Sequence, residues 1–219
     1  LFREAINGNI QFNDSLASVS AITGAVGDDL VKLESLAKTT AKTHKKAGSE
    51  VSKAYELVGS AKPELLGNLE ALDSVTNSVI TLSKASRMDL ETSALSLTGV
   101  MNQFNLTADK SGMTIDALAA GAKFGAASIP QITESILQFG TGAKAFNVNM
   151  HESVALVETF AAKGIKGAEA GTKLRNILTK MSAVGALPKK ALDQLEKFGV
   201  NTKIVSDTTI PLKDRLKEL

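Results

Sequence analysis

The chain has 219 residues with 25 basic and 23 acidic side chains, which gives a formal net charge of +2. This balance lacks the strong basic bias of nucleic-acid-binding proteins, so no sequence-specific nucleic-acid binding is expected. The absence of cysteine excludes disulfides, thiolate metal sites and cysteine nucleophiles. No run of about 18 apolar residues occurs, which predicts no membrane span in this chain.

The apolar side chains are mostly small, since the 43% hydrophobic fraction is rich in Ala, Leu and Val and only 4% of residues are aromatic. In chain order, apolar residues recur at spacings of three and four, the pattern of one buried helix face. The clearest stripes are Leu65, Leu69, Leu72, Val75 and Val79; Leu90, Ala94, Leu97, Met101 and Phe104; Ile129, Ile132, Ile136 and Phe139; and Met150, Val154, Val157 and Ala161.

These stripes predict an all-α fold, a multi-helix array of about ten short to medium amphipathic helices. The helices are expected near residues 2–22, 27–46, 49–60, 63–84, 89–104, 114–124, 129–140, 150–162, 166–183, 188–198 and 211–219. A weak repeat of Glu-x-x-Ala-Leu, at Glu91 and again at Glu152, indicates that the helices could stack as hairpins. The alternative is that capped amphipathic helices simply look alike. Residues 200–205 are the one strand-like stretch.

Three helix starts carry a capping pattern, in which Ser or Asn precedes an acid or amide by three residues. The pairs are Ser86 with Asp89, Ser128 with Gln131, and Asn149 with Glu152. The first side chain can accept hydrogen bonds from first-turn N–H groups, and the second can reach back. Each pair therefore predicts the first turn of a helix.

Candidate catalytic or metal-binding groups are few. His44 lies among lysines, and His151 lies beside Glu152 in a predicted first helical turn. His151 is open to two interpretations, a ligand or base on one side and an exposed helix-start residue on the other, and the second is the plainer. Neither a G-x-S-x-G nucleophile elbow nor a G-x-x-x-x-G-K-[ST] phosphate loop occurs. The sequence therefore predicts no catalytic, cofactor-binding or metal-binding residues and no enzyme.

Two glycine pairs have the spacing of close helix contacts. Gly121 and Gly125 are four residues apart, as are Gly167 and Gly171. Small residues at this spacing let two helices touch backbone to backbone. The pattern predicts close packing at both places, either within the chain or between subunits.

Several short motifs follow one another from about Asp28 to Leu219. The segment 49–54 is similar to the motif G-x-S-x-x-E-V-A-x-A, with Ser52 in place of the usual Ala. The segment 149–156 is similar to G-x-s-x-e-x-A-x-L, with Asn147 in place of the leading glycine. The most specific match is 170–178, which is similar to a-G-T-x-L-R-x-x-L. In this order, the motifs resemble those of phage tail tape measure proteins.

Four residues of that last match are predicted to form a structurally demanding site: Gly171, Thr172, Leu174 and Arg175. The plainer alternative is that Leu174 and Ile177 are ordinary core residues. Arg175 would then be a surface charge or the partner of a helix end.

The resemblance implies a structural tail protein of a phage or prophage, laid along the lumen of the growing tail tube. Its length would set the tail length, and it would assist genome ejection. The implied partners are the tail tube protein, tail assembly chaperones and baseplate or tail tip proteins, with self-association as a further option. The implied location is the virion, after assembly in the cytoplasm of the bacterial host.

The resemblance also divides the chain into three segments. Residues 1–26 are expected to be an N-terminal helix that continues from an upstream segment, and 27–199 the helical, tape-measure-like core. Residues 200–219 are expected to be a short extended turn and the start of a further helix, so the chain looks truncated.

Two other functions remain open. One is a helical interaction module of a bacterial toxin or secretion-type translocator. The other is a cell-wall hydrolase, which would need paired carboxylates or a Cys/His pair.

Overall fold

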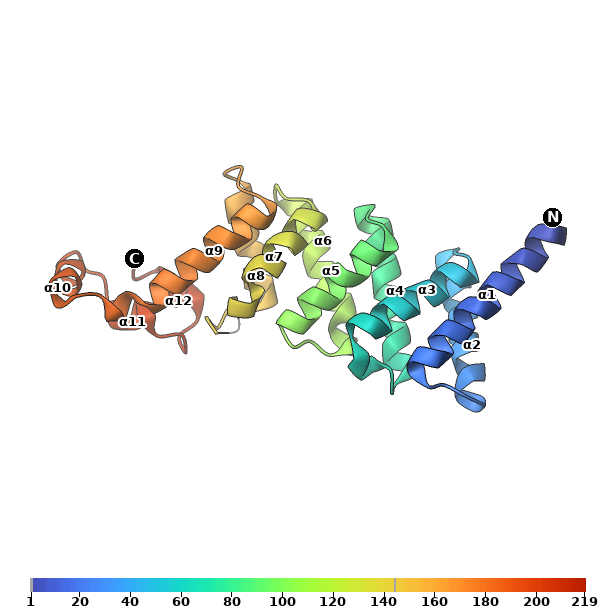
Figure 1. Ribbon diagram of the computed structural model, residues 1–219. Coiled ribbons are helices and arrows are strands. Elements are labelled where there is room, and N and C mark those ends of the chain that lie inside the picture. Colours follow the sequence, from blue (N-terminus) through green and yellow to red (C-terminus); the bar gives the residue numbers. More distant parts are fainter. Residues whose placement is uncertain (1, 144) are drawn as a thin grey trace. The chain divides into compact units, whose positions relative to one another are not determined.

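A computed structural model describes residues 2–143 and 145–219 (Figure 1). Every regular element in these residues is a helix, and no strand occurs among them, which confirms the all-α prediction. The α-helices are α1 (Phe2–Thr23), α2 (Asp28–His44), α3 (Gly48–Ala61), α4 (Leu69–Ser86), α5 (Leu90–Gln103), α6 (Ser111–Phe124), α7 (Ile129–Ala143), α8 (Met150–Ala161), α9 (Gly167–Ser182), α10 (Lys189–Lys197), α11 (Thr202–Ser206) and α12 (Leu212–Leu216). The 3₁₀ helices are η1 (Pro63–Leu65), η2 (Ala108–Lys110) and η3 (Val184–Ala186).

The chain divides into two compact units, of which the N-terminal unit ends at Asp116 and the C-terminal unit begins at Ala117. In the N-terminal unit, α1 packs on α3 and α3 packs on α5, while α2 packs on α4 (Figure 1). Each of the helices α2 to α5 also contacts its neighbour along the chain. The unit is therefore a stack of helix hairpins, with Leu33, Leu72 and Leu97 fully buried between the layers.

The C-terminal unit follows the same scheme. Helix α9 packs along α7, and α8 contacts both of them. The buried side chains between these helices include Ile132, Ile136 and Phe139 of α7 and Leu174 of α9. The last short helices, α11 and α12, pack on each other, and α11 also contacts the end of α9.

One turn geometry recurs where a helix ends and the next begins. A residue with positive φ is followed by one whose N–H bonds to the carbonyl oxygen five residues earlier, as in a Schellman motif. The positive-φ residues are Lys45, Asn105, Asn147, Gly164 and Gly199. The bonds, 2.8 to 3.1 Å from N to O, join Lys46 to Ala41, Leu106 to Met101, Val148 to Ala143, Ile165 to Phe160, and Val200 to Leu195. The next residue in each case is the N-cap of the following helix, so the chain reverses within a few residues.

The strand-like interpretation of 200–205 is wrong. Residues Thr202–Ser206 form helix α11, because Asn201 caps its first turn through a hydrogen bond of 3.3 Å from the Ile204 N–H to Asn201 Oδ1. The β-branched residues that suggested a strand are accommodated in one helical turn, where Val205 is buried.

Two predicted helix starts also need correction. Ser86 is the last residue of α4 rather than a cap, and the N-cap of α5 is Asp89, whose Oδ1 accepts from the Thr92 N–H at 2.8 Å. The single helix expected over 63–84 is divided, since η1 ends at Leu65 and Asn68 caps a new helix that begins at Leu69.

The other two predicted capping pairs form hydrogen bonds at the expected helix starts. Asn149 and Glu152 form the predicted reciprocal capping box, with both N-to-O distances at 3.0 Å. At Ser128, the bond from the second residue of the pair back to the first is present, since the Ser128 N–H donates to Gln131 Oε1 at 3.0 Å.

None of the helices in the described part of the chain is both long and apolar enough to cross a bilayer.

Candidate functional site

The predicted motif lies on α9, the helix that packs along α7. Gly167 is the first residue of α9 and has a φ of +59°. The preceding residue, Lys166, is the N-cap of the helix. A side chain at position 167 would be strained by this φ and would also meet the Glu134 carboxylate at 2.5 Å. Glycine is therefore favoured where α9 begins, because it adopts this conformation without the strain that a side chain adds.

Gly171 lies where the backbone of α9 comes very close to that of α7. A Cβ atom on Gly171 would overlap the carbonyl oxygen of Ser135 and lie 2.6 Å from Gln138 Cβ. The Ser135 hydroxyl oxygen lies 2.6 Å from Gly167 O and 2.8 Å from Gln131 O, so it can hydrogen-bond across the two helices. The glycine spacing thus produces a backbone-to-backbone contact within the chain, as predicted.

The other motif residues occupy different surroundings. Leu174 is 2% exposed and belongs to the core between the helices. Thr172 is half-buried and Arg175 is exposed, so neither takes part in the backbone contact made by Gly171. The alternative expectation that Ile177 is a core residue is wrong, because its side chain is 42% exposed.

The second glycine pair makes a close contact between α6 and α8. A Cβ on Gly121 would lie 2.6 Å from Val154 Cγ1, and one on Gly125 would overlap the Glu158 carboxylate. Glu158 Oε2 accepts hydrogen bonds from the N–H groups of Ala126 at 2.6 Å and Ala127 at 3.1 Å. The carboxylate of α8 thereby fixes the loop that leads into α7.

A mostly apolar cavity of about 300 Å³ lies beside this contact and is lined by Phe124, His151, Val154 and Glu158 among others. His151 is exposed in the first turn of α8, which agrees with the plainer interpretation of this residue. Among the residues that the structure describes, no three His, Asp or Glu side chains gather closely enough to hold a metal ion.

A partly buried polar network, which sequence reasoning missed, joins α2, α3 and α4. Asp73 accepts hydrogen bonds from the Tyr55 hydroxyl, from Thr40 at 2.9 Å and from Asn77 at 3.0 Å. Burial raises the pKa of the Tyr55 phenol, and the neighbouring Asp73 raises it further. His44 lies 2.9 Å from Asn77 Oδ1 through its Nε2. The bonds between different helices carry no sequence signal, because their partners lie 18 to 37 residues apart.

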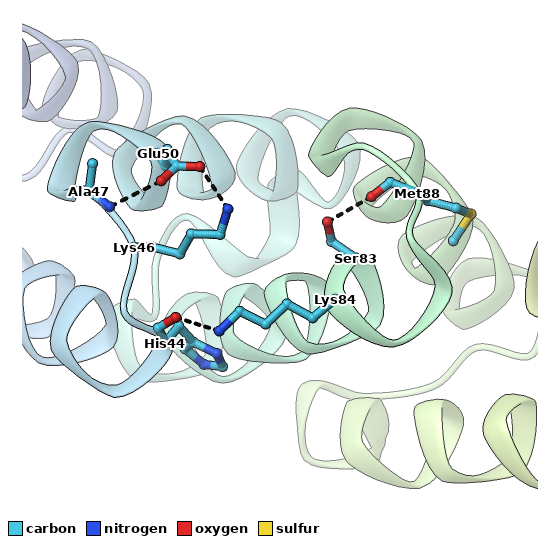
Figure 2. A network of polar contacts seen from close by, with 7 residues as sticks. All are labelled: His44, Lys46, Ala47, Glu50, Ser83, Lys84 and Met88. Atoms are coloured by element: carbon cyan, nitrogen blue, oxygen red, sulfur yellow. Dashed lines mark hydrogen bonds and ion pairs between the residues drawn. The ribbon is translucent and has the colours of Figure 1, made fainter.

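Figure 2 shows how two hairpin turns of the N-terminal unit are joined at the same edge. Lys84 of α4 donates to the carbonyl oxygen of His44 at the end of α2. Glu50 accepts from Lys46 at 2.8 Å and from the Ala47 N–H at 3.1 Å. The Lys46 hydrogen bond lowers the pKa of the Glu50 carboxyl. Lys46, one of the lysines around His44, therefore helps to hold the turn between α2 and α3 in place.

Arg215 is a second feature that the sequence concealed, since this residue of α12 is fully buried. Its guanidinium donates to Val205 O at 2.9 Å, Phe146 O at 3.1 Å and Ser182 Oγ at 3.2 Å. The only sequence signal is its spacing of three from Leu212, which places both on one helix face.

Comparison with known proteins gives a consistent result. The chain is 24% identical over 210 residues to the tape measure protein of Pneumococcus phage Dp-1, covering 95% of this chain and 18% of that protein. It is 28% identical over 153 residues to the probable tape measure protein of Escherichia phage P2, covering 70% of this chain and 18% of that protein. The chain thus spans about a fifth of the length of these relatives, and no solved structure matches it. The model of the phage-related minor tail protein family matches residues 32–219, and the chain therefore belongs to that family.

Proposed function

We propose that this chain is a segment of a phage tail tape measure protein, which sets tail length during assembly of the tail tube and assists genome ejection. The observation that carries the proposal is the extent of the similarity to the Dp-1 tape measure protein, which runs through 95% of the chain. The family is one of structural tail proteins, which supports a non-enzymatic role. A toxin or translocator module is not favoured by these relatives.

Within such a protein, we assign this segment to a folded module rather than to the extended part that measures length. A single extended helix needs partners along its whole length to bury its apolar stripe. Here the stripes of α3, α4, α7 and α9 are buried within the units themselves. A soluble, monodisperse and helical product in circular dichroism and light scattering is the expected behaviour, and a molten or insoluble product would contradict the assignment.

Membership of a tail protein family implies partners within the tail and a place in the virion. We propose the tail tube protein, tail assembly chaperones and baseplate or tail tip proteins as partners, and self-association of this chain as a further contact. Assembly would take place in the host cytoplasm. We also propose a division of the chain into the segments 1–26, 27–199 and 200–219. A structurally demanding role is proposed for four residues of α9, namely Gly171, Thr172, Leu174 and Arg175.

The deciding experiment is electron microscopy of tails after an in-frame deletion in the parent gene. Removing about 60 helical residues outside this segment should shorten the tail by roughly 90 Å, because a helix rises about 1.5 Å per residue. An in-frame insertion of the same length at the same point is the matched control and should lengthen the tail equally. Unchanged tails in both variants would contradict the length-setting function.

A further inference from the structure

The buried guanidinium of Arg215 ties the end of the chain to the rest of the C-terminal unit. Its three acceptors come from three separate places: Phe146 in the turn after α7, Ser182 at the end of α9 and Val205 in the last turn of α11. The Val205 carbonyl lies in the last turn of α11, and carbonyl groups at helix ends carry partial negative charge, so this acceptor suits a cation. One side chain of a five-residue helix therefore bridges elements up to 69 residues apart in sequence.

The three acceptors are all uncharged, which sets Arg215 apart from an ordinary buried ion pair. The nearest carboxylate interaction is with exposed Asp207, whose pKa is lowered mainly by hydrogen bonds from Thr209 and further by the charge of Arg215. Burial correspondingly lowers the pKa of the Arg215 guanidinium. Removing a full charge from water is costly, and neutral acceptors offset that cost only in part.

Few other contacts hold this end of the chain. Helix α10 buries no residue at all. Between Thr202 and Leu219 the buried side chains are Thr202, Val205, Leu212 and Arg215. By contrast, α7 and α9 bury several large side chains against each other. Segments with so few buried apolar contacts open at lower free energy than the core they rest on.

From these observations we propose that Arg215, through its hydrogen bonds to Phe146 and Ser182, is a latch that holds residues 200–219 against the rest of the unit, while its bond to Val205 keeps α12 on α11. The buried charge of Arg215 makes this latch easy to open. Opening returns the guanidinium to water and frees α11 and α12 together, while α7 and α9 stay packed. The C-terminal segment is thus a detachable element of the unit. This inference concerns conformation and does not depend on the function proposed above.

Hydrogen–deuterium exchange, measured by mass spectrometry on peptides within 200–219, 129–143 and 167–182, tests the latch. In the unmodified protein, 200–219 should exchange faster than the two core peptides. Arg215→Ala removes all three hydrogen bonds and should speed exchange in 200–219 at least tenfold with the core peptides unchanged. Lys213→Ala, an exposed position on the same helix, is the control and should change nothing.

A second variant separates the role of the charge from that of packing. Arg215→Met keeps a long side chain but removes the charge, so 200–219 should exchange no faster than in the unmodified protein. Exchange in Arg215→Met as fast as in Arg215→Ala would overturn the claim that the charge makes the latch easy to open. Equal acceleration of 200–219 and the core peptides in Arg215→Ala would overturn the latch itself, because Arg215 would then be a general core residue.

Discussion

At Gly171 the backbone of α9 lies so close to α7 that one added methyl group would overlap the Ser135 carbonyl oxygen. The obstacle is backbone rather than the flexible end of a side chain, so it cannot move aside without shifting a helix. Asn147 shows a second single-residue requirement. Its φ of +54° lies in the left-handed region, which explains how an asparagine can stand where the resembling family has glycine.

Gly171→Ala should lower the free energy of unfolding by about 2 kcal/mol, because overpacking against α7 exceeds the gain in helix propensity. Urea denaturation followed by circular dichroism measures the change. Gly112→Ala is the control, since nothing lies within 4 Å of a Cβ at that position of α6. Its stability should stay the same or rise by up to about 1 kcal/mol. Equal stability of the two variants would show that the α7–α9 contact can relax.

At the scale of elements, each hairpin depends on how one helix ends and the next begins. The recurring turn supplies a left-handed residue, a Schellman hydrogen bond and an N-cap in succession. At the start of α8, Asn149 and Glu152 satisfy each other's backbone N–H groups. This combination is local in sequence, so it specifies the turn between two helices through contacts a few residues apart.

Asn149→Ala should destabilise the protein by about 1 kcal/mol, because the Glu152 N–H loses its acceptor at the first turn of α8. Asn149→Asp should retain most of the stability, since aspartate caps equally well. Thermal unfolding reports both values. His151→Ala, in the same turn but exposed, serves as the control. A loss in His151→Ala as large as that in Asn149→Ala would argue against the capping explanation.

For the molecule as a whole, several exposed or partly exposed carboxyl groups have lowered pKa values in the folded state. The pKa of Glu50 is lowered mainly by Lys46, that of Asp89 by Thr92, and that of Asp207 by Thr209. A lowered folded-state pKa stabilises the fold above the unfolded-state value and loses this effect as pH falls through the folded-state value. These groups therefore favour the folded protein near neutral pH.

The melting temperature should accordingly stay level between about pH 7 and 5 and fall as the pH drops below about 4.5, where unfolded carboxyl groups begin to take up protons. Circular dichroism melts across this range measure the change. Glu50→Gln should flatten part of the decline, because that side chain no longer titrates. A melting temperature that rises on acidification would contradict the sign of these pKa shifts.

The sequence by itself determined the helical class, most helix positions, the capping box at Asn149 and the close approach at both glycine pairs. These features depend on periodicity and on contacts between residues a few positions apart, which a single sequence displays directly. The same local logic failed at 200–205, where β-branched residues concealed the effect of the Asn201 cap.

Only the tertiary structure decided which residues meet across the stack. The network around Asp73 and Tyr55 joins three helices, and the burial of Arg215 depends on acceptors in the turn after α7, in α9 and in α11. Sequence spacing places Leu212 and Arg215 on one face but cannot say that a charged residue is buried there while Leu216 stays 40% exposed. That choice depends on where two backbone carbonyl groups and the Ser182 hydroxyl converge, and only packing brings them together.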